Sequence, residues 1–213
     1  MSANHVLYGS AGSGSAAIEA ALEWADLPYR IVSGASWEPG PGFEALRAVN
    51  PLAQIPTLVL PDGTVLTESA AILIHLGLVH PHSGLLPSEA SVRAQALRAL
   101  VFIAANCYAA VGISDYPERW CAEPDEASNA RVRTAARVQL HRAWDLFADQ
   151  FDGEPFLFGP QPNAVDLLAA VVSKWSGTRA HLKRSRPRFL DTLLRIEAQP
   201  RIAAVFARHW QAA

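Results

Sequence analysis

The sequence predicts a small α/β domain followed by an all-helical domain, with the change near residue 84. Short β-branched runs alternate with helical patterns only before residue 80. From about residue 88 onward, apolar residues recur only at helical spacing. The segment HPHSGLLPSEA between these regions has the composition of a connecting loop. We therefore assign residues 1–80 to the first domain, 81–87 to a linker and 88–213 to the helical domain.

The first domain opens with an apolar strand over His5–Tyr8 and a serine- and glycine-rich loop, GSAGSGS. Alanine, leucine and tryptophan at helical spacing predict a helix over Ser15–Ala25. Tyr29–Val32 then reads as a second strand. Ser33–Gly42 contains several glycines and prolines, so we expect a loop there.

The second half of this domain begins with a short helix over Phe43–Val49, which ends because the residue before a proline disfavours the α region. Gln54–Leu60 is a β-branched, apolar strand, and the turn Pro-Asp-Gly joins it to a partner strand over Thr64–Thr67. The run AAILIHL after Thr67-Glu68-Ser69 predicts a helix. Strand, helix, strand, helix, hairpin, helix is a thioredoxin-like order.

The second domain is predicted to be an all-α helical bundle. The basic segment HLKRSRPR near position 185 reads as a solvated loop before a helix. The expected helices span Ser88–Ser114, Asp125–Gln150, Asn163–Trp175, Pro187–Ala198 and Pro200–Trp210.

Composition excludes several classes of function. Half of the 213 residues are hydrophobic and 18% are charged, as in a globular protein, and a net charge of −2 disfavours nucleic acid as a partner. The apolar runs are shorter than the about 20 residues that span a bilayer, so we expect no membrane association. The start lacks the features of a signal peptide. Two cysteines give no metal-binding spacing, so we expect no metal, and they suit a reducing cytoplasm.

A helix-start signal stands in the second domain. Asn163 precedes an apolar run, and Asp166 follows three residues later. An asparagine at the N-cap accepts a hydrogen bond from an otherwise unpaired N–H, and a carboxylate three residues on can reciprocate. We assign this pair a structural role.

Taken in order, Asn-Pro, Ile55-Pro56, Glu68-Ser69 and the Asn163-x-x-Asp166 cap resemble the glutathione S-transferase family, and the overall pattern is most similar to its bacterial members. The resemblance covers nearly the whole chain. It implies a thioredoxin-like domain that binds glutathione, followed by a helical domain that forms the acceptor pocket.

The resemblance also implies which residues contact glutathione. Ile55, before a cis Pro56, offers its backbone to the cysteinyl part of the tripeptide. Glu68 accepts from the γ-glutamyl ammonium, and Ser69 at a helix start donates to the carboxylate. Further contacts to the glycyl end are expected from two residues, Gln54 and Trp37; for Trp37 an anchoring role in its loop is the alternative.

The thiol donor is expected in the loop after the first strand. Ser13 matches the catalytic serine of serine-type members, and a shift of the loop would promote Ser10 or Ser15 instead. Backbone N–H groups alone are a further alternative, as is a purely structural role for all three serines. Cysteine-type bacterial members carry their reactive cysteine at the position of Gly14, so this chain lacks the residue for mixed-disulfide chemistry.

The acceptor pocket is expected on the first long helix of the second domain, from Asn106, Tyr108 and Val111. A histidine occupies the position of Tyr108 in cysteine-type relatives. Tyr108 lines the pocket or bonds an acceptor, unless it packs in the core or a dimer interface. The segment Tyr116–Trp120 breaks this helix and can roof the site.

The family therefore implies a cytoplasmic, homodimeric detoxification enzyme that joins the glutathione thiolate to a hydrophobic electrophile. The alternatives within the family are an isomerase, an etherase or a dehalogenase that uses glutathione. A non-catalytic protein that binds glutathione is the alternative outside enzymes, because a loop of serines and glycines can also be a degraded donor site.

Overall fold

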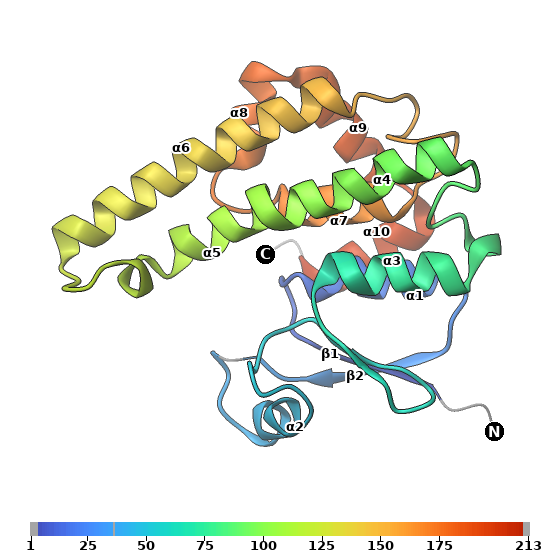
Figure 1. Cartoon of the computed structure of the whole chain (residues 1–213), viewed down its shortest axis with the longest axis horizontal. Helices are drawn as coiled ribbons and strands as arrows, with labels where there is room; N and C mark the ends of the chain where they lie inside the picture. The colour runs from blue at the N-terminus through green and yellow to red at the C-terminus, as the bar shows by residue number, and fades with distance from the viewer. Residues whose placement is uncertain (1–3, 36, 211–213) are drawn as a thin grey trace.

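The computed structural model describes residues 4–35 and 37–210 and confirms the predicted fold class, a thioredoxin-like α/β region followed by helices (Figure 1). Its sheet contains β1 (His5–Gly9), β2 (Tyr29–Ser33), β3 (Thr57–Val59) and β4 (Val65–Leu66) in the order β2-β1-β3-β4. β2 runs parallel to β1, whereas β3 is antiparallel to both β1 and β4. The first domain is thus a βαβ unit followed by a hairpin, as the sequence predicts.

Two helices separate the sheet from the helical domain, and a third lies on the opposite face of the sheet (Figure 1). The inner helices are α1 (Ser15–Trp24) and α3 (Ser69–Val79), and the outer one is α2 (Pro41–Val49). Leu7 on β1 pairs with Leu58 on β3, and both are fully buried beneath α1 and α3 in one continuous core. This packing fixes where α1 and α3 begin.

The helical domain surrounds α7, whose residues are all buried and which contacts α1, α3, α4 and α9. α5 and α6 lie side by side and extend beyond the sheet (Figure 1). Short 3-10 segments occur at Pro81–Ser83 and Pro117–Trp120. The helices are α4 (Ala90–Phe102), α5 (Ala109–Asp115), α6 (Glu126–Gln150), α7 (Ala164–Val172), α8 (Thr178–Ser185), α9 (Pro187–Glu197) and α10 (Pro200–His209).

The long helix expected over Ser88–Ser114 forms, but it begins at Ala90 and contains a π-helical turn. Glu89 accepts hydrogen bonds from the N–H groups of Ser91 and Val92, at 2.9 and 2.8 Å, and so starts α4 at Ala90. A π-helical turn over Ile103–Tyr108 then joins α4 to α5. Such a turn adds one residue to the helical repeat, which periodicity alone does not reveal.

The predicted loop at HLKRSRPR is wrong, because most of it forms α8. Leu182 is fully buried, while His181 and Ser185 both bond Asp145 on α6, at 3.0 and 2.7 Å. These contacts fix a short helix that carries too few apolar residues for periodicity to detect. The strand expected over Gln54–Leu60 is also shorter, since its first three residues turn away from the ladder and Pro56 has no N–H to donate.

The Asn163 cap is confirmed. The Asn163 side chain accepts from the N–H of Val165 at 2.9 Å, and Asp166 accepts from the N–H of Asn163 at 2.9 Å and from that of Leu157 at 3.0 Å. Asp166 therefore holds the segment before α7 as well as its first turn.

One continuous helical stretch, Ala90–Asp115, has the length and mean hydropathy, 1.7, of a membrane span. Counting uninterrupted apolar residues missed it, because polar residues divide the run. In this fold the stretch packs on α6 and α7, and Phe102 contacts Phe147 with ring centroids 5.7 Å apart. It serves as a wall of the helical domain.

Candidate active site

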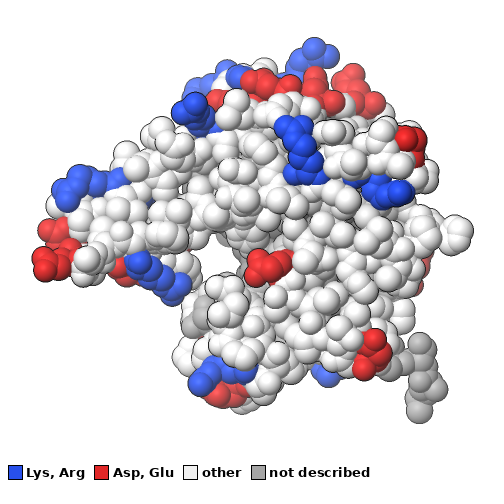
Figure 2. Space-filling view, in the orientation of Figure 1, with Lys and Arg blue, Asp and Glu red and all other residues white. Residues whose placement is uncertain are grey.

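The candidate site lies between the sheet domain and the helices, where Figure 2 shows a hollow with acidic atoms at its rim. One cavity of about 400 Å³ faces the start of α3, and another of about 310 Å³ faces the start of α1. All six residues predicted to contact glutathione line the first cavity, namely Trp37, Gln54, Ile55, Pro56, Glu68 and Ser69.

The backbone before β3 is held open toward the first cavity. Buried Asn50 donates to the Gln54 carbonyl at 3.1 Å and to the Thr57 hydroxyl at 2.9 Å, and Thr57 donates to the same carbonyl at 2.8 Å. The Ile55–Pro56 bond is cis, as expected. Within residues 4–35 and 37–210, neither the N–H nor the C=O of Ile55 has a hydrogen-bond partner. Both groups are therefore available to an extended ligand.

The start of α3 provides a charged group and unpaired donors. Glu68 adopts φ 63° and ψ 110° at the N-cap, and its side chain does not cap the helix. Its exposed carboxylate has no ion-pair partner among the described residues. Ser69 and Ala70 begin the helix at the cavity wall, where first-turn N–H groups lack partners within the helix. Such a terminus favours an anion.

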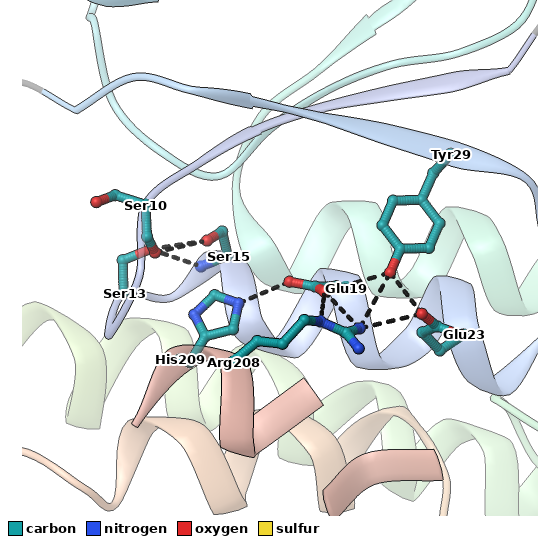
Figure 3. Close-up of polar contacts among 8 residues, drawn as sticks. All are labelled: Ser10, Ser13, Ser15, Glu19, Glu23, Tyr29, Arg208 and His209. Atoms are coloured by element: carbon teal, nitrogen blue, oxygen red, sulfur yellow. Dashed lines mark hydrogen bonds and ion pairs between the residues drawn. The ribbon is translucent and has the colours of Figure 1, made fainter. Parts of the chain in front are cut away.

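The three loop serines bond mainly to one another (Figure 3). Ser13 Oγ donates to the Ser10 carbonyl at 2.7 Å and lies 2.8 Å from Ser15 Oγ, which itself lies 3.2 Å from that carbonyl. Ser13 Oγ also accepts from the Ser15 N–H at 3.2 Å, and Ser10 Oγ donates to Glu38 at 3.0 Å. Of the three, only Ser13 lines either of these two cavities, and 6% of it is exposed. Its proton is already used within the loop.

The helical side of the site contains two of its three predicted residues. Tyr108 lines both cavities and Val111 lines the second. Asn106 lines neither: it is exposed and donates to the Phe102 carbonyl at 3.2 Å. Asn106 precedes Tyr108 by two positions, and helical geometry places side chains two positions apart on roughly opposite faces.

The site also contains residues of the segment expected to roof it, and one residue, Trp175, that was not assigned from the sequence. Tyr116 lines both cavities, and the Arg119 guanidinium lies 4.0 Å from the Tyr116 ring centroid at the mouth of the first. Trp175 stacks on Tyr108 with centroids 5.6 Å apart and planes 23° apart. The helix break at Tyr116-Pro117 indicates a roof over the site, but no local signal indicates Trp175, which approaches from a distant part of the chain.

Burial controls the titration of the groups near the second cavity. Burial, followed by the charges of Asp115 and Glu68, raises the pKa of Tyr108 to about 12. Burial also raises the pKa of Asp115, against the opposing charges of Arg137 and Arg133. The Tyr108 hydroxyl thus stays protonated at neutral pH and can donate a hydrogen bond. Residues 4–35 and 37–210 contain no group of three or more His, Cys, Asp or Glu arranged to hold a metal ion.

Comparison with known proteins finds relatives of the part of the chain that lines the first cavity. Residues 15–78 match the model of the glutathione S-transferase N-terminal domain. The uncharacterized GST-like protein YncG of Escherichia coli K12 is 32% identical over 172 residues, which are 79% of this chain and 80% of that protein.

Solved structures resemble the chain over both domains. A glutathione transferase homologue from Sulfitobacter with bound glutathione superposes with a TM-score of 0.82 at 24% identity, covering 95% of this chain and 97% of the other. A glutathione S-transferase from Methylobacterium radiotolerans in complex with glutathione sulfonate gives a TM-score of 0.78 at 25% identity, covering 99% and 97%.

Proposed function

Because the chain belongs to the glutathione S-transferase family, we propose that it binds glutathione in the first cavity and transfers the thiolate to a hydrophobic electrophile in the second. One observation carries the proposal: six residues expected to contact the tripeptide lie along a single cavity, with the backbone of Ile55 unpaired.

Glutathione has chemically distinct ends, and the cavity offers a partner for each. The γ-glutamyl ammonium bonds Glu68, and the neighbouring carboxylate accepts from Ser69 at the start of α3. The cysteinyl backbone pairs with the N–H and C=O of Ile55. Gln54 and Trp37 remain for the glycyl end. This orientation directs the sulfur toward the start of α1 and the second cavity.

The reaction is nucleophilic attack by the thiolate. The thiol proton passes to solvent, sulfur forms a bond to the electrophilic carbon, and the leaving group departs with its bonding pair. The helix α1 favours the anion through the positive end of its dipole, and the two adjoining cavities hold the reactants close together.

A dimer is part of the proposal. The family pattern implies that two copies pair across the first domain of one and the helical domain of the other. Large apolar side chains are exposed on both domains, including Leu52 in the first and Val101 and Val138 in the second. Sedimentation at micromolar concentration should give twice the 23.0 kDa of one chain, and a species of 23.0 kDa alone contradicts pairing.

Binding is tested by calorimetry with glutathione. Glu68→Ala removes a charged hydrogen bond, commonly about 1.5–3 kcal/mol, so affinity should fall by roughly tenfold to a hundredfold. Glu44→Ala is the matched control, because Glu44 pairs only with Arg47 on the exposed face of α2. Equal affinity in folded Glu68→Ala and unsubstituted protein would contradict the assignment of the first cavity to glutathione.

Turnover is tested separately, with electrophiles that include an aryl halide, an aryl ether and an isomerisable double bond. Conjugation of the halide supports the proposed transferase. Reaction with only the ether or the double bond selects the etherase or isomerase of the same family. The closed serine cluster favours a second candidate, a non-catalytic glutathione-binding protein, and tight binding without turnover on any compound selects it.

A further inference from the structure

We propose that the hydrogen-bond donor to the glutathione sulfur is the hydroxyl of Tyr108, supplied by the helical domain, and not a serine of the loop. This inference rests on the proposed function, because it assumes glutathione in the first cavity. It differs from the sequence prediction, which placed the donor between the first strand and the first helix.

The first argument is the position of the hydroxyl. A Cβ atom built on Gly14 would collide with the Tyr108 oxygen and lie 2.9 Å from its ring Cζ. Gly14 is the N-cap of α1. The phenol therefore reaches across the domain boundary to the start of α1. There the helix dipole favours negative charge, and the Gly14 N–H has no hydrogen-bond partner among the described residues. A thiolate in contact with this hydroxyl gains both effects.

The second argument is that the hydroxyl is available. Among residues 4–35 and 37–210, the Tyr108 oxygen has no hydrogen-bond partner. The ring is nevertheless fixed, because it stacks on Trp175. Its donor is thus positioned before any ligand arrives. The Ser13 hydroxyl, in contrast, would have to break its 2.7 Å bond to the Ser10 carbonyl to donate to sulfur.

The third argument is that Tyr108 lies where the two cavities meet. Both cavities share Ile55 on the sheet side and Tyr108 on the helical side. A cysteinyl group paired with the Ile55 backbone has its sulfur near this junction, and attack on an acceptor requires the sulfur to face the second cavity. A hydroxyl common to both cavities can bond the thiolate without blocking either reactant.

The chemistry is consistent with a donor role. The raised pKa keeps the phenol protonated, so Tyr108 donates to the sulfur anion and does not remove its proton. The thiol proton goes to solvent. When the C–S bond forms, the negative charge leaves with the leaving group and the phenol retains its own proton.

The test is the thiolate absorbance of the enzyme–glutathione complex as a function of pH, with the full chain. Tyr108→Phe keeps the ring and its stacking and removes only the hydroxyl. It should raise the thiol pKa by about one to two units and lower turnover at pH 7 by roughly tenfold to a hundredfold, while glutathione affinity measured by calorimetry stays within about threefold. Ser13→Ala should leave the titration unchanged.

The outcomes separate this inference from the proposed function. Glutathione binding and a depressed thiol pKa in the unsubstituted protein, with the same titration in Tyr108→Phe, overturn the tyrosine donor and leave the binding assignment intact. A shift in Ser13→Ala but not in Tyr108→Phe returns the role to the serine. Failure of the unsubstituted protein to bind glutathione overturns both, and a thiol pKa that is not depressed overturns the donor role alone.

Discussion

His209 Nε2 lies 2.7 Å from the Glu19 carboxylate, and this buried contact joins the last described helix, α10, to the first helix, α1 (Figure 3). Arg208 adds a second contact to Glu19 at 2.6 Å, and both Arg208 and the Tyr29 hydroxyl bond Glu23. The cluster thus connects the C-terminal helix to the helix whose start faces the candidate site.

Glu19→Gln should destabilise the protein. The substitution removes the charge from a fully buried carboxylate that accepts two charged hydrogen bonds, which costs about 1.5–3 kcal/mol. The free energy of unfolding, measured with urea at pH 7, checks the prediction. Glu23→Gln is the matched control: Glu23 bonds the same Arg208 and is half exposed, so the loss should be smaller. Equal losses would contradict a special role for the buried contact.

The Glu19 contribution should depend on pH. Burial raises the pKa of Glu19, but the hydrogen bonds from His209 and Arg208 together lower it by more than burial raises it. The net shift is therefore downward from 4.5. A group whose pKa is lower in the folded protein than in the unfolded protein contributes its full stabilisation above the unfolded pKa. This stabilisation disappears as the pH falls through the folded pKa. The difference between Glu19→Gln and the unsubstituted protein should therefore be largest above pH 5 and shrink below pH 4.

Asn163→Ala should remove the cap of α7 and cost about 0.5–2 kcal/mol of stability. Glutathione affinity should remain nearly unchanged, because the cap lies outside both cavities of the site. Thermal unfolding and calorimetry together check this. Asn163→Ser, which keeps a side-chain acceptor, should retain most of the stability. Loss of binding with an unchanged melting temperature would contradict the structural role.

The effect of Gly14→Ala on the free energy of unfolding should change sign when Tyr108 is replaced by alanine. Gly14 has φ −62° and ψ −15°, so its backbone accepts alanine, but the new methyl group would collide with Tyr108. We expect a loss of about 1–3 kcal/mol in the unsubstituted background. In a Tyr108→Ala background the same change should stabilise by about 0.4–1 kcal/mol, because the alanine restricts the unfolded chain. Denaturant unfolding of the four proteins measures the coupling, and additive effects would show that the two residues do not touch.

Trp37 should report glutathione binding. Its side chain is 53% exposed at the edge of both cavities, so a ligand there changes its surroundings. Trp37→Phe should remove most of the fluorescence change seen on titration with glutathione. Trp120→Phe should leave that change intact, since Trp120 is 61% exposed and lines neither cavity. The opposite pattern would place the ligand elsewhere.

The fold could be predicted because its signals are local. The alternation of strands and helices, the hairpin turn and the Asn163 cap each depend on residues a few positions apart. The short helix α8 could not, because contacts from His181 and Ser185 to Asp145, about 40 positions earlier, stabilise it. The spacing of apolar residues along the sequence does not reveal such distant polar pairs.

The grouping of six residues along the first cavity could also be predicted, since they come from one local hairpin, its helix and a nearby loop. The environment of the loop serines could not. Whether a loop serine is free depends on its rotamer, and here the hydroxyls of Ser13 and Ser15 both turn toward the Ser10 carbonyl. The approach of Tyr108 to Gly14 crosses the domain boundary and depends on how α4 and α5 dock.

The π-helical turn over Ile103–Tyr108 gives one continuous helix two independent faces. A single additional residue rotates everything after it by roughly 100° relative to an unbroken α-helix. The stretch before the turn places Ala99 and Leu100 in the core, and Tyr108, the last residue of the turn, lines the second cavity. Tyr108 is only partly buried against that core, so substitutions there can change what the cavity accepts while Ala99 and Leu100 keep their packing.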